Sequence, residues 1–516
     1  MSALPGRAPG NEQLMAEQIR VSRTESIRNL VLISLTAGIP RVVGAVFLRK
    51  EPFGDAYCYI EQAAVIKSRI VAGTFSINDL FGFWLPLYQF VCALLSVVVH
   101  QAALASKLVS ALAGAGVCIL VYLCTHVLTA SQRFSLLAAL AIALNPFHIE
   151  YSASAMTDVP HAVLVMACLY FVLKERWILA ACFGAAAAFT RLDSWLLVAL
   201  LPAIQLLRQR RVPILSLLIL SLAPALWLFI CWKTSGDALA SFHGHDQYVL
   251  ARLAAHPEHY HLSWKHLGMD AYRLIYSVNI AVLAGCFAGL WLLLRDWRRN
   301  AGSNELLRIP NLLACLLFFF AYLGFIVTAY LTKSQSDIWH RYGLLMFSLG
   351  LPAAAYSVQQ LVRPFSFRAK AVLASVLVIG LVQFGIQAAD FAKFVIRKPR
   401  NEIIANYLRH EYASDPTIKI FCDSPEVRVI SGIPREQLFD SFAAPRDKAG
   451  FIGFLQTKGI KFLVIPEEAE TSTPSQLFPG LVKESGNLLE GVIPAPDDKR
   501  TDSLYRVRTE QPPPQK

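Results

Sequence analysis

Charged residues are scarce in this sequence. Only 16 % of its 516 residues are Asp, Glu, Lys or Arg, whereas soluble domains contain about 25 %. Hydrophobic residues make up 55 %, and the mean hydropathy is +0.46. This composition argues against a cytosolic globular enzyme. It also argues against a disordered chain, because so much apolar surface must be buried.

Several familiar patterns are absent as well. The ten cysteines include no Cys-x-x-Cys pair and lie mostly in apolar segments, so they predict neither a zinc site nor a disulfide framework. The first 28 residues are polar, and no short apolar stretch with a cleavage site follows them, so we expect an uncleaved anchor. No internal repeat is visible.

The net charge of +12 raises the question of nucleic acid as a partner. The Lys and Arg residues are placed in short clusters between apolar runs, such as Arg208, Arg210 and Arg211, rather than along one soluble face. This pattern is typical of the loops that set membrane topology. The sequence therefore predicts no nucleic-acid partner.

The hydrophobic residues form runs of about 20, each long enough to cross a hydrocarbon core of about 30 Å. Eleven spans are predicted, at 28–48, 107–128, 134–150, 157–173, 177–190, 194–207, 213–232, 276–294, 310–331, 342–361 and 371–389. The apolar segment 84–99 is predicted to lie along the membrane surface. If it also crossed, the most basic connections would face outward, against the positive-inside rule.

The predicted fold is an α-helical polytopic membrane protein with about eleven transmembrane helices, interfacial helices in the first outer loop and a small C-terminal soluble α/β domain. A helix over 401–412 and strands near 418–421, 461–465 and 504–507 predict that domain. We expect a cytoplasmic tail at 1–27 and a membrane domain at 28–389 with outer loops 49–106 and 233–275. An outer α/β domain is expected at 390–510, followed by a disordered Pro-rich end at 511–516.

Ionisable residues close to membrane spans are costly and are candidates for function. Six of them fall on the predicted outer side: Asp55, Asp158, Arg191, Asp193, His340 and Arg341. Arg41, inside the first span, is expected to extend its side chain outward to the interface.

Each member of this set also has a structural interpretation, which stays open. Asp158 suits a helix N-cap, and Asp55 suits a turn. Arg191 and Asp193 suit a local ion pair, and Arg341 suits an anchor to lipid headgroups. The argument for function is that two carboxylates and two or three cations converge on one face.

Such a set suits the transfer of a group from an anionic, lipid-linked donor. One carboxylate takes the proton of an acceptor hydroxyl as general base. Arginine and histidine hold the phosphate and stabilise the charge on the leaving group. The second carboxylate positions the acceptor or holds a metal.

The order of motifs resembles the type C (GT-C) glycosyltransferases, the superfamily of protein O-mannosyltransferases and lipid A aminoarabinose transferases. The motifs that carry the resemblance are Gly54-Asp55-Ala56-Tyr57, Leu85-Pro86-Leu87-Tyr88, Asn145-Pro146-Phe147 through Asp158, Ala186 to Arg191, and His340-Arg341-Tyr342. The resemblance covers roughly residues 28–360, and a soluble tail is common among bacterial members.

The resemblance implies that Asp55 is the base and Asp158 its partner, with an isoprenoid-phosphate sugar as donor. It places the donor phosphate at Arg341, with His340 and Arg191 beside it. Further substrate contacts are expected at Tyr57, Glu61, Tyr88, His243, His245 and Tyr342. The first acidic motif here is a lone Asp, and the Pro-Leu-Tyr segment lacks a doubled Pro, so metal use and one donor contact stay unassigned.

A histidine-rich stretch lies in the second outer loop. Six of the twelve histidines fall there: His243, His245, His256, His259, His261 and His266. A zinc site, a substrate contact and a structural interfacial loop are all open interpretations, since the spacing matches no established metal motif.

The leading hypothesis is a hexosyl- or pentosyltransferase that uses a polyprenyl-phosphate sugar at the periplasmic face of a bacterial inner membrane. The acceptor is a glycan, a lipid or a protein, and a divalent metal is an open possibility. The main alternative is a polyprenyl-lipid transporter or flippase, which would place ionisable residues and broken helices near the midplane. A non-catalytic scaffold for the C-terminal domain is a third hypothesis.

Overall fold

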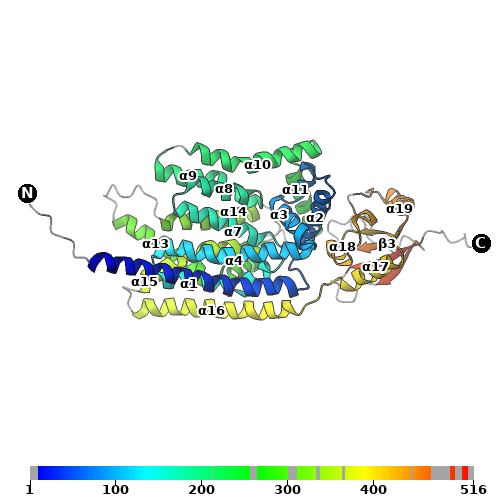
Figure 1. The fold of residues 1–516 in the computed structure, drawn as a ribbon. Helices are drawn as coiled ribbons and strands as arrows, with labels where there is room; N and C mark the ends of the chain where they lie inside the picture. The colour runs from blue at the N-terminus through cyan, green and yellow to red at the C-terminus, as the bar shows by residue number, and fades with distance from the viewer. Residues whose placement is uncertain are drawn as a thin grey trace, which may run out of the picture.

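The computed structural model describes residues 10–211, 213–255, 264–299, 311–332, 338–362, 367–441, 443–445, 447–466, 488–493 and 502–508. The helices form a long bundle, and a small C-terminal domain lies at one end of it (Figure 1). The first helix starts at the opposite end (Figure 1).

The bundle contains α-helices and short 3-10 helices (η). They are α1 (Gly10–Phe47), α2 (Gly54–Val71), η1 (Ile77–Leu80), α3 (Leu87–Val99), α4 (Ala102–Thr129), α5 (Gln132–Ala143), α6 (Pro146–Ser152), α7 (Asp158–Leu173), α8 (Trp177–Ala188), η2 (Leu192–Leu196), α9 (Leu197–Gln209), α10 (Ile214–Ser235), α11 (Ala240–Ala255), α12 (Trp264–Val278), α13 (Ile280–Arg299), α14 (Asn311–Leu331), η5 (His340–Tyr342), α15 (Gly343–Val362) and α16 (Phe367–Val395).

The chain is a multi-pass membrane protein. Among the described residues, seven helical segments are long and apolar enough to cross a membrane: Thr24–Phe47, Ala102–Thr129, Ile214–Ser235, Ile280–Arg299, Asn311–Leu331, His340–Val362 and Ala371–Val395. The bent pair α5–α6 would make an eighth.

The predicted count of eleven spans is therefore not confirmed. The segments predicted at 157–173, 177–190 and 194–207 contain the helices α7, α8 and α9, with 16, 12 and 13 residues. At a rise of 1.5 Å per residue they reach only about 18–24 Å, short of a hydrocarbon core of about 30 Å. Most residues of α7 and many of α8 are buried against neighbouring helices rather than exposed to lipid.

The segment predicted as one span over 134–150 is broken. The axes of α5 and α6 differ by 62°, and Pro146 is the first residue of α6, where its missing N–H costs no helical hydrogen bond. Asn145 caps α6 by accepting from the His148 backbone N–H at 2.8 Å.

Arg41 supplies hydrogen bonds at this break. Its guanidinium donates to the carbonyl oxygens of Ala143 and Ile142 at 3.0 and 3.2 Å, at the end of α5 where helical partners are lost. The expectation that Arg41 extends to the interface is wrong, because the side chain is completely buried.

The segment predicted as the first outer loop folds into α2, η1 and α3, at the end of the bundle nearest the C-terminal domain (Figure 1). With 13 residues, α3 is about 20 Å long, too short to cross a membrane. It packs between α2 and α4, so the segment predicted at 84–99 is held against the bundle.

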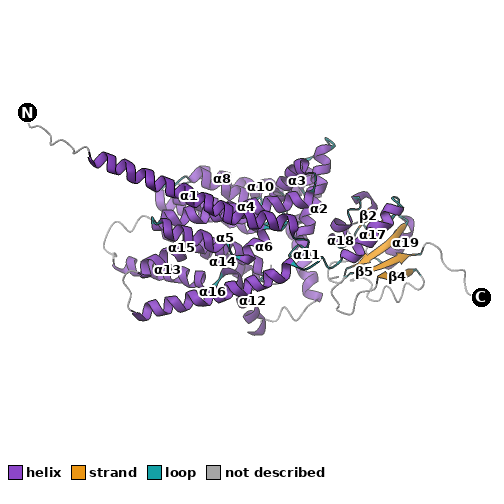
Figure 2. Cartoon of the chain, turned by 60° about the horizontal axis from the view of Figure 1, so that its bottom comes forward, coloured by secondary structure: helices purple, strands orange, loops and turns teal. Residues whose placement is uncertain are grey.

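The C-terminal domain is a small α/β sandwich (Figure 2). Its elements are α17 (Glu402–Ser414), β1 (Lys419–Cys422), α18 (Pro425–Ser431), η6 (Arg435–Gln437), β2 (Leu438–Phe439), α19 (Lys448–Thr457), β3 (Ile460–Ile465), β4 (Leu489–Ile493) and β5 (Ser503–Val507). The strand order is β2-β1-β3-β5-β4; β1 is parallel to β2 and β3, and β5 is antiparallel to β3 and β4. The helix and the three strands predicted from sequence are confirmed, whereas β2 and β4 were missed.

A close backbone contact fixes the turn that carries Arg341. A Cβ on Gly343 would lie 2.4 Å from the Cβ of Ser277 and 3.1 Å from its backbone carbonyl carbon. Only glycine allows α12 to approach η5 this closely.

We therefore expect Gly343→Ala to lower the free energy of unfolding by about 1–3 kcal/mol through overpacking. Thermal unfolding in detergent measures this effect. Gly324→Ala is the matched control, since a Cβ there meets no atom within 4 Å. Equal unfolding midpoints for the two variants would contradict the close contact.

Candidate active site

Two arginine–aspartate ion pairs lie side by side where the bundle meets the C-terminal domain. Arg341 Nη1 lies 2.6 Å from Asp55 Oδ2, and Arg191 Nη1 lies 3.0 Å from Asp158 Oδ1. The guanidinium carbons of Arg341 and Arg191 lie 5.7 and 5.6 Å from the centroid of the Tyr342 ring. One aromatic ring thus holds both cations, and the two pairs form a single cluster.

Local structure explains where the carboxylates stand. Asp55 is in the first turn of α2, and Asp158 is the first residue of α7. The positive end of the helix dipole favours an acidic residue at both positions. The N-cap of α7 is Thr157, so Asp158 is not the cap itself. Asp55 is not a solvated turn residue either, because it is paired with Arg341.

The two carboxylates differ in accessibility. The Asp55 side chain is 30 % exposed and the Asp158 side chain is 5 % exposed. Among the described residues, Asp158 Oδ2 and Arg341 Nε are buried without a hydrogen-bond partner. Arg341 is only 13 % exposed, which excludes the predicted alternative of a headgroup anchor in free contact with lipid.

Behind Arg191 lies a chain of buried polar groups. Arg191 Nε donates to Asp193 Oδ2 at 3.2 Å, and Asp193 Oδ1 lies 3.5 Å from His161 Nε2. His161 Nε2 lies 2.5 Å from Ser194 Oγ, which lies 2.7 Å from the hydroxyl of Tyr322. The local pair of Arg191 and Asp193 exists, and the same arginine also holds Asp158.

Electrostatics keeps Arg191 and Asp193 ionised. Burial alone would lower the pKa of Arg191, but the carboxylates of Asp193 and Asp158 outweigh it and raise this pKa. Burial alone would raise the pKa of Asp193, but Arg191 and His161 outweigh it and lower this pKa. The buried polar groups behind Arg191 therefore keep its side chain positively charged and fixed in position at the site.

Tyr59 and Phe53 are aromatic neighbours of the Asp55–Arg341 pair. The Tyr59 hydroxyl lies 3.4 Å from Thr157 Oγ1, and its ring packs against the ring of Trp84. The guanidinium of Arg341 lies 4.8 Å from the centroid of the Phe53 ring.

Sequence reasoning missed Tyr59 and His161. Tyr59 is four residues after Asp55 on α2, and His161 is three residues after Asp158 on α7. These are spacings that place side chains on one helix face, so helix periodicity was the signal that could have found them.

The hydroxyl or carboxylate groups of several predicted substrate residues have partners outside the two ion pairs. The Tyr57 hydroxyl lies 3.3 Å from Glu426 Oε1, and Glu61 is paired with Arg428, both in the C-terminal domain. The Tyr88 side chain is buried, with its hydroxyl 3.1 Å from the carbonyl oxygen of Ser106.

His340 points away from the two ion pairs. Its ring packs against the rings of Tyr276 and Phe147, with centroids 5.1 and 6.3 Å apart. Its Nδ1 lies 3.4 Å from the carbonyl oxygen of Arg273. His340 was predicted to bind the donor phosphate together with Arg341, and these contacts do not support that role.

The histidine-rich stretch is described only in part. His243 is exposed and lies 2.7 Å from Asp237 Oδ2, and the ring of His245 packs on Phe83. Three of the predicted histidines lie outside the described residues: His256, His259 and His261. The side chain of His266 is not described either. Within the described residues, no group of three or more His, Cys, Asp or Glu could hold a metal ion.

The buried chain behind Arg191 gives a test of stability. Asp193→Asn removes the charge that faces both Arg191 and His161, and breaking a buried ion pair costs about 3 kcal/mol. We expect a clearly lower unfolding midpoint in detergent. Asp237→Asn is the control, because that carboxylate forms an exposed pair with His243, and its midpoint should not move. Similar midpoints for both variants would show that the Arg191–Asp193 pair contributes nothing.

The fold is shared with solved structures of ArnT. Among solved structures, the chain is similar to ArnT from Cupriavidus metallidurans in the apo state, with a TM-score of 0.57 and 14 % identity over 93 % of this chain and 98 % of that one. It is also similar to the same ArnT bound to undecaprenyl phosphate, with a TM-score of 0.58 and 13 % identity over 92 % and 97 % of the two chains. No protein-family model and no curated protein sequence matches the chain significantly.

Proposed function

We propose that the protein is a membrane glycosyltransferase that moves a sugar from a polyprenyl-phosphate donor to an acceptor hydroxyl, with Asp55 as general base. The observation that carries this proposal is the cluster of two Asp–Arg pairs, in a GT-C fold, beside a membrane-spanning bundle. The site is assigned to the periplasmic face of a bacterial inner membrane, together with the C-terminal domain.

Arg341 and Arg191 are suited to hold the phosphate of the donor. Both are ionised, nearly buried and fixed on the Tyr342 ring, so they are already oriented before the lipid arrives. Guanidinium groups bind phosphate oxygens through charge-assisted hydrogen bonds. The structure of ArnT with undecaprenyl phosphate supports a lipid phosphate as the donor's leaving group.

Asp55 is suited to act as the base. It is the more accessible of the two carboxylates. When the donor phosphate takes Arg341, the carboxylate of Asp55 loses its partner and is free to contact the acceptor hydroxyl. The acceptor O–H proton then passes to Asp55, the acceptor oxygen bonds to the anomeric carbon, and the bond from that carbon to the phosphate oxygen breaks. The electron pair leaves with the lipid phosphate, where the arginines stabilise the charge.

Asp158 has a supporting role in this scheme. It remains paired with Arg191, and its free Oδ2 accepts a hydrogen bond from the acceptor or the sugar. Tyr342 is assigned to the substrate site, as the sequence predicts, because its ring packs against both arginines. A divalent metal stays unassigned, as do the sugar and the acceptor.

The decisive experiment is transfer of radiolabelled sugar from a panel of polyprenyl-phosphate sugars by the purified protein in detergent. We expect Asp55→Asn to abolish turnover with normal expression and folding, since the side chain is partly exposed. Asp296→Asn, an exposed carboxylate on α13, is the matched control and should keep full activity. Donor hydrolysis or transfer by the wild type that persists in Asp55→Asn would refute Asp55 as the base. Saturable lipid binding without any turnover would favour a flippase.

Binding of polyprenyl phosphate tests the role of Arg341. Arg341→Ala should weaken binding about tenfold or more, because a hydrogen bond to a charged group contributes about 1.5–3 kcal/mol. Asp55→Asn should bind the lipid at least as tightly as the wild type, since it frees Arg341 from a competing carboxylate. Arg299→Ala, an exposed arginine at the end of α13, is the control for charge alone. Unchanged affinity in Arg341→Ala would remove Arg341 from the donor site.

A further inference from the structure

Helix α2 has two polar faces that point to different parts of the molecule. Asp55 and Tyr59 are four residues apart and contact Arg341 and Thr157 of the bundle. Tyr57 and Glu61 are also four residues apart and contact Glu426 and Arg428 of the C-terminal domain. Because residues four apart share a helix face, α2 lies between the candidate site and the C-terminal domain and contacts both.

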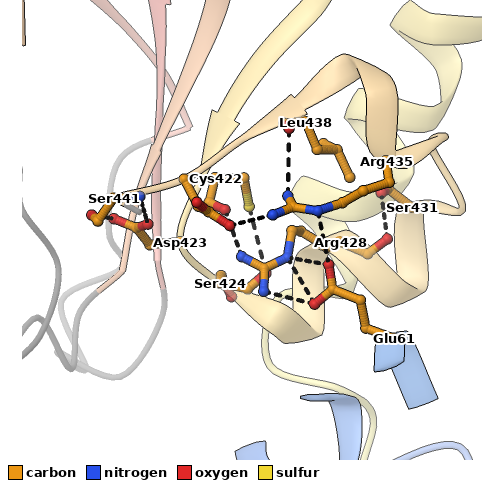
Figure 3. A network of polar contacts seen from close by, with 10 residues as sticks. Glu61, Cys422, Asp423, Ser424, Arg428, Ser431, Arg435, Leu438 and Ser441 are labelled. Carbon is orange, nitrogen blue, oxygen red and sulfur yellow. Dashed lines mark hydrogen bonds and ion pairs between the residues drawn. The ribbon is translucent and has the colours of Figure 1, made fainter. Parts of the chain in front are cut away.

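The contact between Glu61 and Arg428 is a bidentate ion pair. Arg428 Nε lies 3.0 Å from Glu61 Oε1, and Arg428 Nη2 lies 2.7 Å from Glu61 Oε2 (Figure 3). The remaining Nη1 donates to the carbonyl oxygen of Cys422 at 2.9 Å, at the end of strand β1. Arg435 adds a second cation 3.7 Å from Glu61.

The pair is well shielded from water. The side chains of Arg428 and Glu61 are 11 % and 21 % exposed. Planar, two-point Arg–carboxylate contacts fix orientation as well as distance. Arg428 therefore sets both the position and the rotation of α2 relative to the sheet.

Glu426 provides a second attachment on the same short helix, α18. It lies within hydrogen-bond distance of the Tyr57 hydroxyl, and it accepts from the Arg400 backbone N–H and from Asn401 Nδ2 at 3.1 and 2.9 Å. Residues 400 and 401 lie between the last membrane helix, α16, and α17. Glu426 thus connects α2 to the segment that enters the C-terminal domain.

We propose that Arg428 is a positioning residue for the reaction: through Glu61 it holds α2 so that Asp55 stands at Arg341. This inference rests on the proposed function. Glu61 and Asp55 are six residues apart, about 9 Å along one rigid helix, so a shift at Glu61 is transmitted to Asp55. A displacement of about 1 Å at a reacting group can cost about 100-fold in rate.

This role differs from two simpler ones. If the C-terminal domain only binds an acceptor, loss of the Glu61–Arg428 pair should change the acceptor KM and leave kcat unchanged. If the pair only stabilises the fold, its loss should lower the unfolding midpoint without a specific effect on the rate. A positioning role predicts a loss of kcat at nearly constant donor KM.

The test uses the full-length protein with the single variants Arg428→Gln and Glu61→Gln and the charge exchange Glu61→Arg with Arg428→Glu. We expect each single variant to lower kcat at least tenfold, with the donor KM within about twofold. The double variant Glu61→Gln with Arg428→Gln should be no worse than either single variant, because both remove one interaction. The charge exchange should recover at least part of the lost rate.

Arg508→Gln is the matched control. Arg508 Nε lies 3.5 Å from Glu490 Oε2, an exposed pair inside the C-terminal domain that involves neither α2 nor α18. This variant should keep kcat. Equal losses of kcat in Arg508→Gln and Arg428→Gln would overturn the proposal.

Hydrogen exchange at the backbone amides of α2 gives a readout that does not depend on turnover. Arg428→Gln should accelerate exchange in the first two turns of α2, and Arg508→Gln should not. An inactive wild type would refute the proposed function, and the exchange data would still decide whether Arg428 holds α2. An active wild type with unchanged kcat and unchanged exchange in Arg428→Gln would refute the positioning role.

Discussion

The ion pair between Asp55 and Arg341 is the interaction on which the rest of the site depends. Arg341 lies in a largely water-excluded position, where a lone charge is costly, whereas Asp55 is partly exposed. The pairing therefore requires α2 and η5 to meet, and the glycine at 343 permits the backbone approach of α12 that holds η5 in place. The second pair, the Tyr342 ring and the buried chain behind Arg191 are arranged around this meeting point.

The residue types of the site follow from the sequence, because ionisable groups at the ends of apolar runs are few. Asp55, Asp158, Arg191 and Arg341 converge in the structure as their shared side of the membrane predicted. The sequence did not indicate which of these four residues pair with each other. Arg341 is 286 residues from Asp55, and no periodicity links such distant segments. His340, its direct neighbour, turns to Tyr276 instead, since adjacent residues in a 3-10 turn point in different directions.

Helix geometry also explains why other predictions find no support in the described structure. Tyr57 and Glu61 were expected to contact the substrate. They lie on a different face of α2 from Asp55 and contact the C-terminal domain, where Arg428 is 367 residues from Glu61. Hydropathy predicted eleven spans because it registers apolar residues and not helix length. The breaks at Pro146 and around Arg191 shorten the helices between them, so α7 and α8 depend on their neighbours for burial.

The sequence separation within the site has a consequence for biosynthesis. Asp55 is made 286 residues before Arg341, which at about 5–20 residues per second corresponds to about 15–60 s of translation. During that interval the carboxylate is already at the membrane without its partner. Arg428 follows later still. The nascent chain therefore cannot bring its two site arginines together until most of the helices have been inserted, so assembly of the candidate site comes late in synthesis.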